Sequence, residues 1–257
     1  NNITANNIST NANTNKHHGV FLDTSSSGNL VSRNVISINA SNNNYGVIID
    51  SSASSNTITS NIISTNGTSG NNYGIYIQSF ANNNIISSNI ISTNGTNDDY
   101  GIIVESSNHN IFSFNNITTN ATVTDFAIFL NGSARNNNFT DSVINASRTF
   151  DVRDETTGAR TNSLINSTFN KTDISFAASS DGKILVFYRL DVRTIDTSSN
   201  PIISATVTGS DNSTVADIEN PTSSFSKTTN STGYIEQQTL TEFLANLTYN
   251  SSTGGSG

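Results

Sequence analysis

The most frequent chemically competent motif in the sequence is N-x-S/T with x other than Pro, the acceptor sequence for N-glycosylation. It occurs sixteen times, which is only modestly more than the Asn, Ser and Thr content gives by chance. We expect covalent N-glycans at several of these sites, because the repeat described below places them on outward faces or at loops. The sites are Asn2, Asn7, Asn39, Asn66, Asn94, Asn116, Asn120, Asn131, Asn138, Asn145, Asn166, Asn170, Asn212, Asn230, Asn246 and Asn250.

A row of acidic and amide side chains is the second candidate site. One residue past each of five aligned apolar segments stand Asp23, Asp50, Gln78, Glu105 and Asn131. Carboxylates about 5 Å apart on neighbouring strands repel one another unless a cation or sugar hydroxyls lie between them. The three acids are therefore a weak candidate Ca²⁺ site. No D-x-D-x-D-G loop accompanies them, so a solvated acidic edge is the simpler interpretation.

Catalysis would need acid and base groups gathered in one place, and the sequence shows no such cluster. His17 and His18 precede the first complete repeat, whereas His109 lies in a turn three repeats later. Asp98 and Asp99 are expected in a loop near the acidic row. The absence of Cys excludes thiol catalysis and Cys-ligated metals, and a net charge of −8 disfavours nucleic acid and polyanionic uronates. We predict that the protein is not an enzyme.

The composition leaves two kinds of chain open. Of 257 residues, 118 are Asn, Ser or Thr, and only 33% are hydrophobic. Such a chain is either a low-complexity polar tail or a repeat fold with a thin apolar core. No run of about 20 apolar residues occurs, so we predict no membrane span.

A repeat of 26 to 28 residues decides between them. Each apolar segment is followed by an N-x-I-x-x-N-x-I-x-x-N module, and its short, alternating, β-branched runs predict strands. Three strands in about 27 residues leave no room for crossover helices, so the pattern predicts a parallel β-helix of six to seven coils. The aligned segments are His18–Leu22, Tyr45–Ile49, Tyr73–Ile77, Tyr100–Val104 and Phe126–Leu130.

The alternation of a strand assigns a role to each position of the module. The two apolar positions, Ile58 and Ile63 in one copy, should face inward and stack coil on coil. The two Asn positions, Asn56 and Asn61 in the same copy, should form ladders whose amides hydrogen-bond along the rod. We expect these Asn residues themselves to adopt the left-handed conformation that tight corners need.

The register loosens after Asn145, and a different pattern follows Asp181. The stretch GKILVFYRLDVRTI and the apolar runs after it are separated by turn residues every 10 to 12 positions, which predicts a small antiparallel β-sandwich. We therefore expect a β-helix over residues 1–181, a sandwich over 182–250 and a Gly/Ser tail over 251–257. The whole chain is predicted to be all-β.

These motifs resemble two known families. The repeated coils, over about residues 1–176, resemble the right-handed parallel β-helix repeats of the NosD/pectate-lyase-like superfamily. The stretch 190–243, with Asn200-Pro201-Ile202 and Thr232-Gly233-Tyr234, resembles carboxypeptidase-regulatory-like (prealbumin-like) sandwich modules. Their pairing is similar to large surface proteins of archaea. The resemblance implies the fold but not one function, since the superfamily includes lyases, epimerases, adhesins and structural stalks.

Three functions fit these observations. We favour a non-enzymatic, N-glycosylated extracellular or cell-surface subunit that assembles head to tail with other copies of itself into a filament, sheath or surface layer, since its first coil presents an unprotected strand edge. The first alternative is a carbohydrate-binding or carbohydrate-processing β-helix of lyase or epimerase type. The second is a calcium-dependent adhesin stalk. No cofactor other than this weakly indicated Ca²⁺ is expected.

Overall fold

The computed structural model describes residues 1–67, 69–210 and 224–247, with the side chains of 12–16 left aside. It divides into two compact units. Unit 1 comprises Asn1–Ile184 with the described residues from Ala245 on, and unit 2 comprises Leu185–Leu244. All the regular elements of the described residues are strands, and they include no helix with the length and apolar character that a membrane crossing requires.

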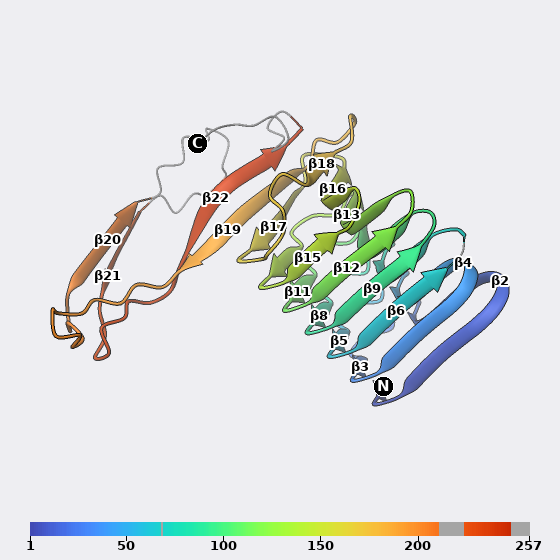
Figure 1. The fold of residues 1–257 in the computed structure, drawn as a ribbon, viewed down its shortest axis with the longest axis horizontal. Helices are drawn as coiled ribbons and strands as arrows, with labels where there is room; N and C mark the ends of the chain where they lie inside the picture. Colours follow the sequence, from blue (N-terminus) through green and yellow to red (C-terminus); the bar gives the residue numbers. More distant parts are fainter. Residues whose placement is uncertain (68, 211–223, 248–257) are drawn as a thin grey trace. The chain divides into compact units, whose positions relative to one another are not determined.

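Unit 1 is a parallel β-helix of about six coils, which confirms the predicted fold (Figure 1). Its chain winds through three sides. The first side contains β1 (Asn2–Thr4), β3 (Leu30–Ser32), β5 (Thr57–Thr59), β8 (Ile85–Ser87), β11 (Ile111–Ser113), β14 (Asn138–Thr140) and β17 (Thr161–Ile165). The second contains β6 (Ile62–Gly67), β9 (Ile90–Gly95), β12 (Asn116–Ala121) and β15 (Val143–Ala146). The third contains β7 (Asn72–Ile77), β10 (Asp99–Glu105), β13 (Asp125–Gly132), β16 (Phe150–Thr156) and β18 (Ile174–Phe176).

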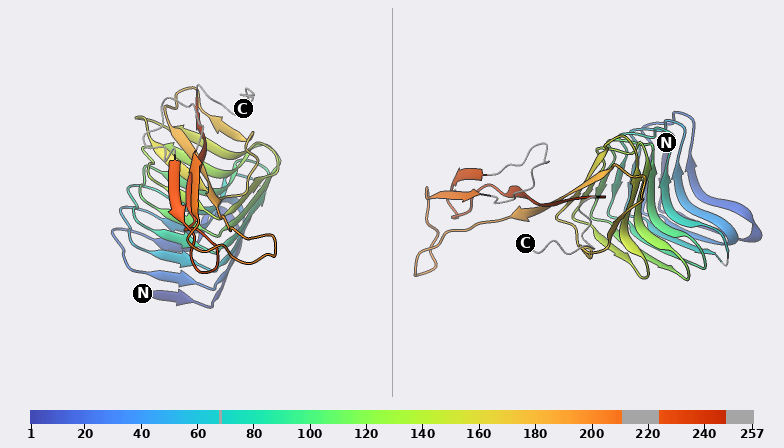
Figure 2. Two further views of the ribbon diagram at one scale, coloured as in Figure 1. Left: turned by 90° about the vertical axis from the view of Figure 1, so that its left-hand side faces the viewer. Right: turned by 90° about the horizontal axis from the view of Figure 1, so that it is seen from above.

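The second and third sides are continuous in the first two coils. There β2 (Asn7–Leu22) and β4 (Val35–Ile49) each run through both sides without a break, and β4 pairs with β6 by its first half and with β7 by its second. The coils lie in parallel register, so that Ile58 pairs with Ile86 and Ile63 pairs with Ile91. Figure 2 shows them stacked one on the next.

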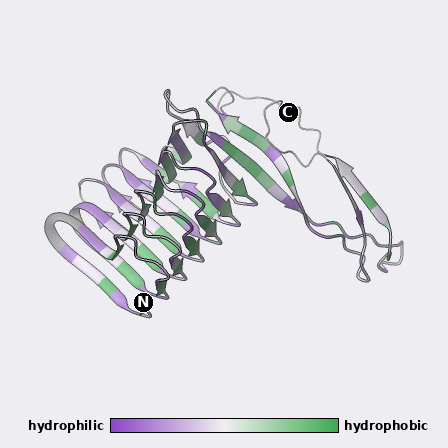
Figure 3. Cartoon of the chain, turned by 180° about the vertical axis from the view of Figure 1, so that it is seen from behind, coloured by the Kyte–Doolittle hydropathy of each residue, from purple (hydrophilic) through white to green (hydrophobic). Residues whose placement is uncertain are grey.

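The apolar positions of the module form the core, as predicted. Ile58, Ile63, Ile86 and Ile91 are 0 to 1% exposed, and Phe112 stacks on Phe139 with ring centroids 4.2 Å apart. Hydrophobic segments recur at the same place in successive coils (Figure 3). A thin core that continues from coil to coil therefore suffices, which explains how a chain with so few apolar residues folds.

The two Asn ladders exist, but the conformation expected for them is wrong. Asn61 Oδ1 accepts two hydrogen bonds from Asn34, one from its backbone N–H at 2.9 Å and one from its side-chain Nδ2 at 3.0 Å. Asn61 Nδ2 in turn donates to the Val31 carbonyl at 2.9 Å. The left-handed residue of the corner is the one before the ladder Asn, such as Ser60 with φ 57°. The left-handed residue turns the chain, and the following Asn is thereby free to aim its amide inward and satisfy buried backbone groups.

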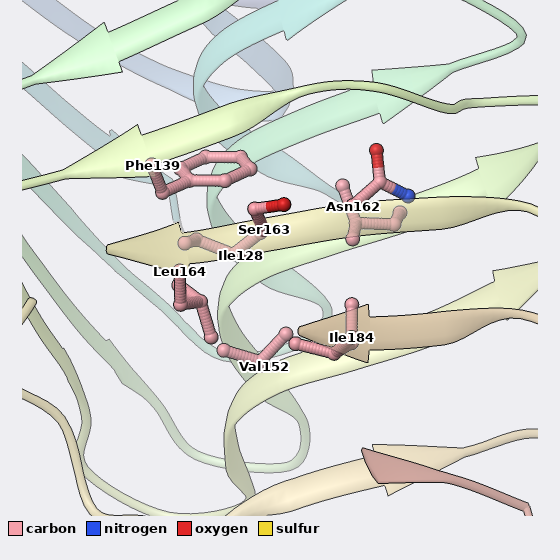
Figure 4. A pocket seen from close by; sticks show the side chains of 8 residues that line it. Ile128, Phe139, Val152, Asn162, Ser163, Leu164 and Ile184 are labelled. Carbon is pink, nitrogen blue, oxygen red and sulfur yellow. The ribbon is translucent and has the colours of Figure 1, made fainter. Parts of the chain in front are cut away.

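The core is filled at its C-terminal end. In Figure 4, side chains from β13, β14, β16, β17 and β19 (Lys183–Leu190) converge inside the last coils. Phe139, Leu164, Val152 and Ile184 are each at most 2% exposed, and the space between them is too small to admit a water molecule. This end of the column is a packed core rather than a ligand site.

Unit 2 contains a small antiparallel sheet, as predicted. Its strands β20 (Thr206–Ser210) and β21 (Ser224–Thr228) pair antiparallel, and β22 (Gln238–Asn246) is hydrogen-bonded to β19. Every described side chain of β20 and β21 is at least partly exposed. The full sandwich stays a prediction, and the Gly/Ser tail predicted over residues 251–257 lies outside the described residues.

Candidate functional site

An aromatic column runs along the outer face of the third side. His18, Tyr45, Tyr73, Tyr100 and Phe126 stack in sequence, with ring centroids 5.0 to 5.2 Å apart. The spacing equals the rise of one coil, because each ring occupies the same position of the repeat. Burial raises the pKa of the Tyr73 and Tyr100 hydroxyls well above the ordinary value, so these rings stay neutral.

A second outward column alternates large and small side chains. The register runs Phe21, Ile48, Tyr76, Ile103 and Phe129 across successive coils. Each isoleucine therefore lies in a notch between two aromatic rings, and Ile48 and Ile103 are only 4% and 3% exposed.

The notch over Ile48 is a groove of about 280 Å³. It is lined by His18, Phe21, Tyr45, Ile48, Asp50, Tyr76 and Gln78. Phe21, Tyr45, Ile48 and Tyr76 supply apolar and aromatic surface, and Asp50 and Gln78 supply hydrogen-bonding groups. A concave apolar surface with a few polar groups at its edge is the usual form of a small-ligand site.

Two members of the acidic row, Asp50 and Gln78, line the groove, and the carboxylates of the row accept hydrogen bonds from neutral neighbours. Gln78 Nε2 donates to Asp50 Oδ2 at 3.0 Å, and the Tyr76 hydroxyl donates to Glu105 Oε2. Asp23 is exposed and accepts the backbone N–H of Thr24 at 2.7 Å. Gln78 separates Asp50 from Glu105 in the row, so these two carboxylates are not on adjacent coils, whereas Asp23 and Asp50 follow residues that pair directly, Leu22 and Ile49.

The candidate metal ligands Asp23, Asp50 and Glu105 lie on different coils, because each follows the third-side segment of its own repeat. Within residues 1–67, 69–210 and 224–247, no three His, Cys, Asp or Glu side chains come together as a metal site requires. The Ca²⁺ site stays a prediction from the sequence, and of its candidate residues only Asp50 lines the groove.

Asp99 lies elsewhere than expected. It is the first residue of β10 and fully buried, in a third polar ladder with Asn44, Asn72 and Asp125. Asn72 Nδ2 donates to Asp99 Oδ1 at 2.7 Å. A Cβ at Gly95 would lie 2.7 Å from Asp99 Oδ2, so only glycine leaves room for this carboxyl at the arch between β9 and β10. Burial raises the pKa of Asp99 to about 7.

The structure places most of the sixteen glycosylation motifs at the surface. Asn131 and Asn246 are half-buried, and Asn212 and Asn250 lie outside the described residues. The exposed acceptors are Asn2, Asn7, Asn39, Asn66, Asn94, Asn116, Asn120, Asn138, Asn145, Asn166, Asn170 and Asn230. These positions are compatible with glycans, and glycosylation itself stays a prediction.

Sequence reasoning missed the groove because it used the aromatic residues only to align the repeats. Strand alternation alone places Tyr45 on the same face as the inward Val47 and Ile49, so no signal in the sequence indicated that the ring faces outward. The structure breaks this alternation at Gly46, where a Cβ would point at Ile63 of the core.

Comparisons with known proteins leave the family open. No protein-family model matches the chain, and no curated protein matches it. Among solved structures, the tailspike protein of E. coli bacteriophage HK620 in complex with a pentasaccharide is 11% identical, covers 93% of this chain and 67% of its own, and has a TM-score of 0.18. A mutant of that tailspike gives 11% identity, 94% and 68% coverage, and a TM-score of 0.17. Similarities of this size carry no argument about the chain.

Proposed function

We propose that the protein is a non-enzymatic β-helix that binds a neutral saccharide in the groove over Ile48. One observation carries the proposal: the groove combines aromatic rings, of which Phe21 is exposed and Tyr45 and Tyr76 are half-buried, with the carboxylate of Asp50 and the amide of Gln78. The faces of a sugar ring present C–H groups that pack on aromatic side chains, while its rim presents hydroxyls that donate to carboxylates and exchange hydrogen bonds with amides.

Charge selects among saccharides. The chain carries a net charge of −8, and the groove lining includes the carboxylate of Asp50, while Glu105 accepts the hydroxyl of the lining residue Tyr76. Such a surface repels uronate polymers and favours neutral or cationic sugars.

The second notch extends the same surface. Ile103 lies between Tyr76 and Phe129, with Glu105 at its edge, as Ile48 lies between Phe21 and Tyr76 with Asp50 at its edge. The two notches are two coils apart, or about 9.6 Å from the spacing of parallel strands. A linear oligosaccharide that follows the rod would contact both.

A glycan array of neutral, cationic and uronate polysaccharides tests the proposal. The expected result is binding to neutral or cationic members, with uronates unbound at low salt where repulsion is strongest. Binding restricted to uronates would contradict the charge argument. Release of unsaturated or epimerised products from a bound polysaccharide would instead favour the lyase or epimerase alternative.

The N-glycosylated, self-assembling extracellular subunit is the second candidate. The observation in its favour is a row of exposed aliphatic side chains on the outer face of the second side, where Val35, Ile62 and Ile90 are 44, 49 and 52% exposed. Apolar rows of this kind are often covered by another molecule, here a second copy of the chain. Sedimentation velocity over a hundredfold concentration range tests it: a concentration-dependent increase in size supports assembly, and a constant monomer contradicts it.

A further inference from the structure

We propose that Asn170 is the preferred N-glycosylation site of the folded chain, and that Thr172 and Asp173 prepare its amide for the reaction. The proposal is independent of the saccharide groove. It selects one acceptor from motifs that are equivalent in sequence, on the basis of what each acceptor amide contacts.

The loop around Asn170 holds the acceptor amide in an activated arrangement. Asn170 Oδ1 accepts the Thr172 hydroxyl at 2.9 Å and the Thr172 backbone N–H at 3.2 Å. Asn170 Nδ2 donates to Asp173 Oδ2 at 2.9 Å. Donors on the oxygen and an acceptor on the nitrogen both favour the imidate-like form of the amide, in which the nitrogen is a better nucleophile.

The loop is also anchored and accessible. The backbone N–H of Asn170 donates to Oδ2 of Asp151, which is 2% exposed, at 2.6 Å, and the Asp173 N–H donates to the Asn170 carbonyl at 2.9 Å. These bonds close a turn of four residues outside any strand, with Asn170 and Thr172 exposed. An enzyme can therefore reach the acceptor without opening the fold.

Most other acceptors are in a different situation. Asn39, Asn66, Asn94 and Asn120 lie within strands and pair with one another in register on successive coils. Their backbones are fixed in the sheet, so an enzyme that needs a flexible segment reaches them only in the unfolded chain. Glycans on neighbouring rungs would also start about 4.8 Å apart and would crowd one another.

Two further acceptors lie outside strands and serve as comparisons. Asn166 Nδ2 donates to Asp141 Oδ1 at 2.7 Å, but the described contacts of Asn166 include no bond from the Thr168 hydroxyl. Asn230 Oδ1 accepts the Thr232 hydroxyl at 2.7 Å, as Asn170 accepts that of Thr172. Asn230 thus shares the hydroxyl contact, and Asn170 adds the carboxylate on the nitrogen.

The reaction is a glycosyl transfer from a lipid-linked sugar diphosphate, catalysed by an oligosaccharyltransferase. Asn170 Nδ2 attacks the anomeric carbon, and a C–N bond forms. The bond between that carbon and the phosphate oxygen breaks, and the lipid diphosphate leaves with its electron pair. Asp173 lies where the proton lost from Nδ2 is accepted before it passes to solvent.

The experiment uses the full chain produced in a host without N-glycosylation. The folded protein and a urea-unfolded sample are each incubated with an oligosaccharyltransferase and a lipid-linked oligosaccharide, and occupancy at each site is followed by mass spectrometry. We expect Asn170 to be modified first in the folded sample, at least about tenfold faster than Asn39 or Asn66, and the difference to disappear on unfolding. Modification of Asn39, Asn66, Asn166 or Asn230 at the rate of Asn170 or faster in the folded sample would overturn the proposal.

The variant Asp173→Ala isolates the carboxylate while leaving the N-x-T motif intact. Asp173→Asn is unsuitable, because it creates a new motif with Ser175. We expect Asp173→Ala to slow modification of Asn170 about tenfold, the equivalent of one charge-assisted hydrogen bond, and to leave Asn230 unchanged. Asn230 in the same sample, together with an unchanged melting temperature, shows that the variant is folded. Equal rates at Asn170 with and without the carboxylate would remove Asp173 from the proposal.

Discussion

The buried carboxyl of Asp99 is expected to make the folded chain less stable as pH rises from 5 to 8. One of its oxygens accepts Asn72 Nδ2, and the other is buried and makes no hydrogen bond. Burial raises the pKa of Asp99 to about 7 from 3.8, the hydrogen bond from Asn72 lowers it, and the nearby charge of Asp125 raises it further. The folded chain therefore holds the Asp99 proton more tightly than the unfolded chain does.

The sign and size of the effect follow from that difference. Because the folded pKa is the higher one, the stabilisation is fully present below pH 3.8 and is lost as pH rises through about 7. A difference of about three pKa units corresponds to roughly 4 kcal/mol in total, of which roughly 2.5 kcal/mol is lost between pH 5 and pH 8.

The substitution Asp99→Asn removes the titrating group while preserving the ladder. An amide already occupies this column two coils earlier, where Asn44 Nδ2 donates to Asn72 Oδ1 at 2.8 Å. We expect the variant to be more stable than wild type at pH 8 and to lose roughly 2.5 kcal/mol less between pH 5 and pH 8. Urea denaturation at pH 5, 6, 7 and 8, followed by circular dichroism, measures both quantities.

The neighbouring residue supplies the control. Asp98→Asn makes the same chemical change at a half-buried position and leaves the Asp99 carboxyl in place, so the stability of this variant should still fall as pH rises from 5 to 8. Parallel curves for Asp99→Asn and wild type would refute the reasoning, because they would mean that Asp99 is ionised in the folded chain at pH 5.

Two further predictions concern the repeat itself. Asn61→Ala leaves the buried N–H groups of Asn34 without their acceptor, so we expect a loss of about 3 kcal/mol or more in urea denaturation, against less than about 0.5 kcal/mol for the exposed Asn66→Ala. Gly74→Ala would place its Cβ 2.2 Å from Ile91 Cγ2, and we expect it to prevent folding or cost more than about 3 kcal/mol. As the control, a Cβ added at Gly28 would lie within 4 Å of no other atom, so Gly28→Ala should cost only about 1 kcal/mol, because the backbone φ of Gly28 is positive. Equal melting temperatures for Gly74→Ala and Gly28→Ala would contradict this account of Gly74.

The fold of unit 1 could be predicted because each coil repeats the same physical problem. Ile58 and Ile63 recur at inward positions every 26 to 28 residues, and only a stack of strands in register buries all of their equivalents at once. The Asn ladders followed from the same periodicity. Their conformation did not, since the left-handed corner residue is Ser60 in one coil and Phe114 in another, with no common residue type to reveal it.

The candidate site was harder to predict, because it depends on differences between coils. The groove exists because the side chain of Ile48 is smaller than those of Phe21 and Tyr76, its partners on the adjacent coils. An alignment of the repeats shows what the coils share and does not reveal such differences between them. The burial of Asp99 was hidden for a related reason. The sequence Asn97-Asp98-Asp99 reads as a polar loop, whereas the register pairs Asp99 with Asn72 inside the arch.

The binding of a saccharide by the groove over Ile48 is tested most directly by isothermal titration of one array-positive oligosaccharide. The same ligand is titrated into wild type, Tyr76→Ala and Tyr188→Ala, the last being a Tyr of unit 2 that is 39% exposed and lies outside the groove. We predict that Tyr76→Ala weakens binding roughly tenfold or more, since one aromatic wall of both notches is lost, and that Tyr188→Ala binds as wild type does. Unchanged affinity in a folded Tyr76→Ala variant would contradict the proposal.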